Sequence, residues 1–162
     1  MPLSFGVTFD YRCPFARNAH EHLLAGLAGG ADWDVRFVPF SLGQVHVPEG
    51  GVDVWDEPER DSGLLALQAG VVVRDRFPEQ FPAVHDALFA ARHDEALHIK
   101  DPQVVSDILT RHDVDADEVL AAIADGTFGL MKRPADKGRG LEGVARKARD
   151  YYNPASEILE GE

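Results

Sequence analysis

The chain has 162 residues, of which 44% are hydrophobic, and its formal net charge is −12. This length fits a single domain with a sizeable hydrophobic core and room for an insertion. The acidic balance argues against nucleic acid and against an anionic membrane surface as partners, because both are bound through clustered Lys and Arg. The chain contains one cysteine, which excludes an intramolecular disulfide and therefore a disulfide-stapled secreted scaffold.

The N-terminal residues also bear on the compartment of the protein. They lack the basic region and the apolar run of a signal peptide, and no apolar run approaches membrane-spanning length. We therefore expect a cytoplasmic protein, because a lone thiol persists in a reducing compartment.

The N-terminal part of the chain predicts a strand, a helix and a second strand. Residues 3–9 are apolar and rich in β-favouring side chains, and residues 33–40 alternate apolar and charged side chains. Between them, residues 14–27 carry leucines at helical spacing, and Pro14 suits the first helical position because its missing N–H has no partner there. Two strands joined by a helix are expected to pair in parallel through a right-handed crossover.

A long connection then leads to a block of helices. Residues 41–56 are rich in Gly, Pro and Val and predict a loop. Four helices are predicted beyond it, at about residues 58–76, 82–96, 101–112 and 115–124. Asp101 and Asp115 are the expected caps of the last two helices. The remainder predicts a very short strand, a loop and a helix, at residues 127–131, 132–140 and 141–152.

The turn between the first strand and the first helix carries the chemistry. Cys13 directly precedes Pro14, so it is expected at the helix N-terminus, where unpaired backbone N–H groups and the helix dipole stabilise a thiolate. The thiolate is the nucleophilic form of cysteine. Arg12 and Arg17 add positive charge near the sulfur, whereas Asp10 opposes them if it lies close.

The histidines and aromatic residues have structural interpretations. None of the histidine pairs considered has the four-residue spacing of a helical metal-ligand pair, so we expect no metal site and solvated or core-edge histidines. Phe77, Phe81 and Phe89 are expected in the core of the helical block, with a pocket above Cys13 as the alternative. Trp55 has a loop position that also suits contact with a ligand or a partner chain, and Trp33 is expected to pack under the sheet.

The run from Phe9 to Phe15, with Cys13-Pro14-Phe15 opening a helix after the first strand, resembles the DsbA-like thioredoxin family. The helical block after a strand–helix–strand unit resembles it too, and residues 76–81 and 85–89 are similar to cytosolic actinobacterial members. The resemblance implies an α/β, thioredoxin-like fold with an inserted helical subdomain and a sheet that is incomplete. It divides the chain into a thioredoxin-like domain, residues 1–56 and 127–162, and an inserted helical subdomain, residues 57–126.

The resemblance implies thiol–disulfide or thiol-conjugate chemistry. One difference from the family's motif determines which mechanism is expected. The family pairs two cysteines as Cys-x-x-Cys, but Ala16 stands at the second position. The expected function is therefore a thiol–disulfide oxidoreductase or thiol-dependent transferase with Cys13 as the single nucleophile. Arg12, Pro14, Phe15 and Ala16 are the expected substrate-binding residues. No bound cofactor is expected, and the cosubstrate is a low-molecular-weight thiol such as mycothiol or glutathione.

A second hypothesis is a non-catalytic, degenerate thioredoxin-like module that binds a partner or forms a homodimer. Ala16 favours it, and so does the lack of a Val-Pro or Thr-Pro pair after Gly126, where the family places such a pair opposite the cysteine. A short sheet also leaves a strand edge that a second chain can complete.

Overall fold

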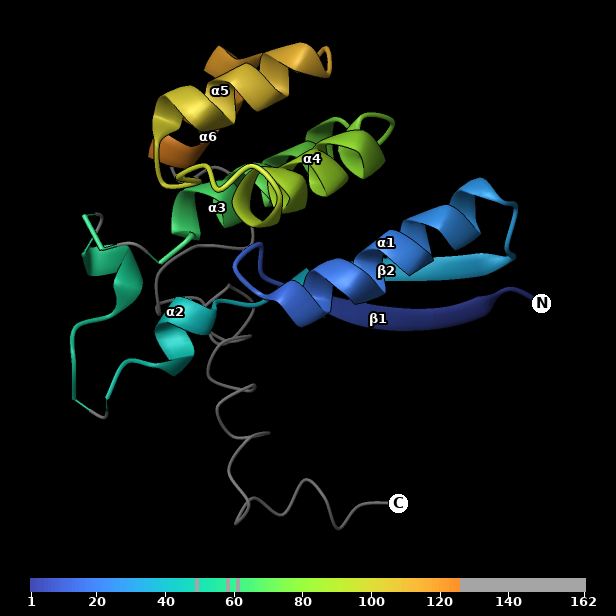
Figure 1. Cartoon of the computed structure of the whole chain (residues 1–162), viewed down its shortest axis with the longest axis horizontal. Coiled ribbons are helices and arrows are strands. Elements are labelled where there is room, and N and C mark those ends of the chain that lie inside the picture. The colour runs from blue at the N-terminus through green and yellow to red at the C-terminus, as the bar shows by residue number, and fades with distance from the viewer. Residues whose placement is uncertain (49, 58, 61, 126–162) are drawn as a thin grey trace, which may run out of the picture.

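The computed structural model describes residues 1–48, 50–57, 59–60 and 62–125. The N-terminal part is a β–α–β unit made of β1 (Leu3–Phe9), α1 (Pro14–Ala28) and β2 (Trp33–Pro39). The two strands pair in parallel along all seven residues of each, and Figure 1 shows α1 running alongside them. The predicted strands, their parallel pairing and the helix between them are confirmed. Within the described residues the sheet has these two strands.

The connection after β2 is structured, which corrects the loop expected for residues 41–56. It contains a short helix and a 3-10 turn, α2 (Leu42–Val45) and η1 (Val54–Asp56). Ser41 caps α2 by accepting a hydrogen bond from the Gln44 backbone N–H at 3.2 Å. The Gln44 side chain then joins α2 to η1, because its Oε1 accepts from the Val54 N–H at 3.0 Å and its amide nitrogen donates to Asp53. These side chains satisfy the backbone N–H groups of Gln44 and Val54. The connection is therefore ordered by specific hydrogen bonds that its composition does not reveal.

Four helices form a block beyond this connection: α3 (Leu64–Arg76), α4 (Phe81–His93), α5 (Pro102–Arg111) and α6 (Ala116–Asp125). The central helix is α3, which packs against the other three, while α4 also packs against α1 (Figure 1). The predicted caps hold: Asp101 accepts from the Gln103 N–H at 2.9 Å, and Asp115 from the Glu118 N–H at 3.0 Å. The block follows the β–α–β unit in the chain, so the α/β class and the helical subdomain after the first unit are confirmed.

Helix α3 begins later than predicted, at Leu64 instead of near residue 58. Gly63 has a φ of 70°, in the left-handed region, so the α-helix cannot extend back through it. A Cβ at Gly63 would also lie 2.8 Å from the Arg12 side chain.

The three valines at residues 71–73 of α3, unusual within a helix, are all buried. Burial on several faces therefore outweighs the modest helix propensity of valine.

The aromatic residues lie mainly in the core. Phe81 and Phe89 are buried, and the partly buried Phe77 packs against the same core, which confirms their core interpretation. Trp55 is half-buried and packs against this core, and its contact with a ligand or a partner chain stays a prediction. Trp33 packs against Gly26 of α1 and Phe5 of β1, as expected for a side chain under the sheet, although 36% of it is exposed.

Some predictions fall outside the described residues. The strand, loop and helix expected over residues 127–152 lie there, as does the second part of the predicted thioredoxin-like domain, residues 127–162. The domain division therefore stays a prediction. In the part of the chain that the structure describes, no helix combines the length and the apolar character needed to cross a membrane.

Candidate functional site

Cys13 is the N-cap residue of α1. Its backbone is extended, with φ −90° and ψ 113°, and its Sγ accepts a hydrogen bond from the Ala16 N–H at 3.4 Å. Pro14 occupies the first turn of the helix, and the Cys13 carbonyl accepts the first helical bond from the Arg17 N–H at 3.1 Å. The sulfur thus takes the place of the Ser or Asp oxygen that usually satisfies a free N–H at a helix start. Both the N–H and the helix dipole place partial positive charge beside the sulfur.

Asp10 closes the turn in front of the cysteine. Its carbonyl accepts from the Cys13 N–H at 2.9 Å, and its Oδ1 accepts from the Arg12 N–H at 2.8 Å. Its Oδ2 accepts from the Leu42 N–H at 2.7 Å, which ties the turn to α2. Asp10 is 1% exposed, and this burial raises the pKa of its carboxyl group to about 6, against the lowering effect of both backbone bonds and of Arg12. Its side chain is therefore mainly a structural brace for the turn.

Tyr11 ends a buried hydrogen-bond chain that sequence analysis missed. Its Oη lies 2.8 Å from Nδ1 of His85, whose Nε2 lies 2.8 Å from Nδ1 of His20. The Nε2 of His20 lies 3.0 Å from the Thr8 carbonyl oxygen. Tyr11, His20 and His85 are each at most 1% exposed, so the expectation of solvated or core-edge histidines is wrong for these two. A signal was present, because His20 shares the helical spacing of Leu23, three residues on, and of the other leucines of that stripe.

The C-terminal end of α4 also reaches the turn. The Nε2 of His93 donates to the Tyr11 carbonyl oxygen at 2.9 Å. Next to it, Asp94 forms a two-pronged ion pair with Arg17 of α1. Arg17 also pairs with Glu21, at 3.0 Å. Of the two arginines expected near the sulfur, Arg17 is thus paired with carboxylates, and α4 of the helical block contacts both the turn and α1.

The expected substrate-binding residues have different surroundings. Phe15 is 82% exposed and Pro14 is exposed, so both present apolar surface beside the sulfur. Arg12 is half-buried, with its aliphatic carbons against Gly63. Ala16 packs against the core, and its contribution to the sulfur is its backbone N–H. All four lie beside Cys13 because they are its neighbours in sequence, and their roles in binding stay predictions.

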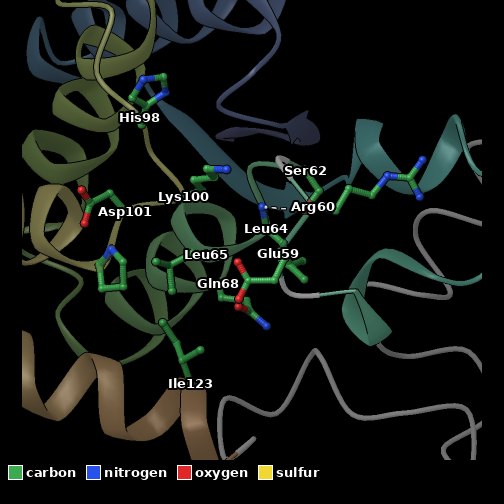
Figure 2. A pocket seen from close by; sticks show the side chains of 11 residues that line it. Glu59, Arg60, Ser62, Leu64, Leu65, Gln68, His98, Lys100, Asp101 and Ile123 are labelled. Carbon is green, nitrogen blue, oxygen red and sulfur yellow. Dashed lines mark hydrogen bonds between the residues drawn. The ribbon is translucent and has the colours of Figure 1, made fainter.

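A cavity of about 760 Å³ lies between the start of α3, the segment before α5, and α6 (Figure 2). Its lining includes Arg60 and Lys100 as well as Glu59 and Asp101, so residues of both charges border it, and Leu65 and Ile123 add apolar surface. Neither Cys13 nor the aromatic residues of the helical core line it. No group of three His, Cys, Asp or Glu that could hold a metal occurs among the described residues.

Comparison with known proteins gives two unrelated similarities. The family model "D-Lysine 5,6-aminomutase TIM-barrel domain of alpha subunit" matches residues 79–158. The alpha subunit of lysine 5,6-aminomutase from Acetoanaerobium sticklandii is 53% identical over 34 residues, which are 21% of this chain and 7% of that protein. The chain therefore spans a small fraction of this curated relative. The described part of the family match, residues 79–125, is helical and contains no strand, whereas a TIM barrel alternates strands and helices.

The second similarity is structural. A solved structure of a variant of DsbA from Pseudomonas aeruginosa resembles this chain with a TM-score of 0.45 and 20% sequence identity. The alignment covers 78% of this chain and 61% of that one.

Proposed function

We propose that the protein carries out thiol–disulfide exchange, or thiol-dependent group transfer, with Cys13 as its single nucleophile. The observation that supports this proposal is the hydrogen bond from the Ala16 N–H to Sγ at the start of a 15-residue helix. This arrangement favours the thiolate form that attacks disulfides. The exposed Phe15 and the half-buried Arg12 flank the sulfur and offer an incoming thiol an apolar and a cationic contact.

The exchange proceeds in two steps. The Cys13 thiolate attacks one sulfur of a small disulfide, the S–S bond breaks, and the other half leaves as a thiolate while a mixed disulfide forms on Cys13. A second external thiolate then attacks this mixed disulfide, forms a new small disulfide and restores the Cys13 thiolate. The external thiol is needed because Ala16 occupies the position of a resolving cysteine. Mycothiol or glutathione, the abundant small thiols of a reducing cytoplasm, are the proposed cosubstrates.

The test is to incubate the folded protein with glutathione disulfide and with mycothiol disulfide and to measure intact mass. We expect a mass increase equal to one small-thiol adduct, its removal by excess free thiol, and turnover in a thiol-transfer assay. Cys13→Ser should show neither adduct nor turnover. An unmodified wild-type protein, or turnover that survives in Cys13→Ser, would overturn the proposal.

A second candidate is a non-catalytic module that pairs with another chain. The observation that favours it is the sheet, in which, within the described residues, each strand is paired on one side only. Leu3 of β1 is 60% exposed, and unpaired strand edges are templates for β-sheet extension. Sedimentation across a concentration series separates the candidates. A concentration-dependent dimer without thiol turnover supports the module, and a monomer with turnover supports the exchange enzyme.

A further inference from the structure

Two histidines of α4 hold the two ends of one residue, Tyr11. His85 contacts its phenolic oxygen at 2.8 Å, and His93 donates to its backbone carbonyl oxygen at 2.9 Å. A little over two helical turns separate the two histidines. Helix α4 therefore binds both the side-chain end and the backbone of Tyr11. Tyr11 stands two positions before Cys13, within the turn that Asp10 closes.

The hydrogen-bond chain has one direction when its groups are neutral. The Thr8 carbonyl oxygen can only accept, so His20 carries its proton on Nε2 and accepts at Nδ1. His85 must then donate from Nε2 to His20 and accept at Nδ1, so the Tyr11 hydroxyl donates. Burial lowers the pKa of both histidines and raises that of the tyrosine, which favours these neutral forms. Each polar atom in this hydrogen-bond chain therefore has one specific partner, and the Tyr11 side chain has one favoured position.

The turn is consequently fixed from two sides. Leu42 of the α2 connection binds the Asp10 carboxyl group, and α4 binds Tyr11 through its two histidines. The contact between the Ala16 N–H and the sulfur is 3.4 Å long, and hydrogen bonds weaken as their geometry departs from the optimum. A small shift of the turn would therefore change how well the helix start stabilises the thiolate.

We propose that His93 and His85 are positioning residues for Cys13, which they hold in place through Tyr11. This inference rests on the proposed function, in which Cys13 is the reacting thiol. The alternative is that these bonds only join the helical block to the β–α–β unit. In that case they contribute to stability and leave the reactivity of the sulfur unchanged.

The experiment exploits the two separate contacts of the His93 ring. The ring stacks on Phe89, with centroids 6.4 Å apart, and its Nε2 donates to Tyr11. His93→Phe keeps a stacking ring and removes the donor, whereas His93→Gln keeps an N–H donor at a similar distance from the backbone and removes the ring. His98→Phe, at an exposed position after α4, is the matched control. The readout is the rate at which iodoacetamide alkylates Cys13 at neutral pH, in protein shown to be folded by circular dichroism.

We expect His93→Phe to slow alkylation by about twofold to tenfold, the range of one net hydrogen bond. His93→Gln and His98→Phe should react like the wild type. Equal rates in all four proteins, or a slower reaction in His93→Gln alone, would overturn the proposal. Should His93→Phe fail to fold, His93→Ala removes the same donor at this partly buried position and carries the same expectation.

A thiol-transfer assay on the wild-type protein separates this result from the proposed function. A wild type that transfers no thiol, combined with slower alkylation in His93→Phe, contradicts the proposed function and retains the positioning role. A wild type that transfers thiol, combined with unchanged alkylation in the variants, contradicts the positioning role alone.

Discussion

The Tyr11 hydroxyl lies 2.8 Å from Nδ1 of His85, a residue 74 positions later in the chain. This bond joins the turn in front of Cys13 to the middle of α4, inside a core of aromatic rings. Phe9 and Phe81 contact the His85 ring at centroid distances of 4.8 and 4.7 Å. The cysteine turn is therefore part of the same packed unit as the helical block, and its geometry depends on that packing.

Gly70 allows α3 to approach this bond. A Cβ there would lie 2.3 Å from the buried Tyr11 hydroxyl oxygen, whereas a Cβ at Gly26 would lie 2.4 Å from the end of the partly exposed Trp33 ring. We expect Gly70→Ala to lower the free energy of unfolding by about 1–3 kcal/mol, the cost of overpacking, despite alanine's higher helix propensity. Gly26→Ala should cost less, because the Trp33 ring can move. Urea unfolding measures both, and a Gly70→Ala protein as stable as the wild type would contradict the account of this contact.

The His20–His85 pair makes the free energy of unfolding depend on pH. Burial lowers the pKa of both rings below the ordinary 6.5, so the unfolded chain binds protons first as the pH falls. The contribution of these two histidines to the free energy of unfolding is complete above about pH 6.5. It is lost as the pH falls from their pKa in the unfolded chain towards their lower pKa in the folded protein. Urea unfolding at a series of pH values should show this loss, and His85→Leu should reduce its slope by about one proton. An unchanged slope in that variant would show that His85 does not titrate on unfolding.

Asp10 acts with the opposite sign. Its pKa rises from 3.8 to about 6 on folding, so the folded state holds its proton more tightly. The contribution of this proton to the free energy of unfolding is complete below the pKa of Asp10 in the unfolded chain. It is lost as the pH rises from about 4 to about 6, by about 3 kcal/mol at most. Asp10→Asn cannot titrate, so the wild type should lose stability relative to this variant across that range. Parallel stability curves for the two proteins would rule out this titration.

The ion pair between Arg17 and Asp94 joins α1 to the end of α4 on a partly exposed surface. Exposed pairs contribute little and are screened by salt. We expect Asp94→Asn to lower the urea midpoint by less than Gly70→Ala does, and the difference from the wild type to shrink with added salt. A large effect that salt does not alter would mean that the pair braces the cysteine turn.

Local signals in the sequence predicted most of the elements. Residues 3–9 form a strand as expected, and Pro14, Asp101 and Asp115 act at helix starts as their chemistry predicts. Each of these outcomes depends on neighbours a few positions away. The start of α3 was missed because it depends on the left-handed backbone of Gly63, which packs against Arg12 from a distant part of the chain.

The candidate site was predicted only in part for the same reason. The position of Cys13 as a helix cap follows from the sequence around Pro14, and the structure has it there. The partners of Tyr11 and Asp10 could not be predicted, because His85, His93 and Leu42 reach the turn only after the chain folds. His20 and His85 lie among apolar residues at helical spacing, but their pairing across 65 positions has no local signature.

The most direct test of the central claim compares alkylation of Cys13 in the folded protein and in the same protein unfolded in urea, at neutral pH. N-acetylcysteine with and without urea corrects for the effect of urea on the reaction. The helix start should make the folded protein react faster than the unfolded one, because the Ala16 N–H and the helix dipole stabilise the thiolate. A folded protein that reacts no faster than the unfolded chain would contradict the claim that this fold activates Cys13.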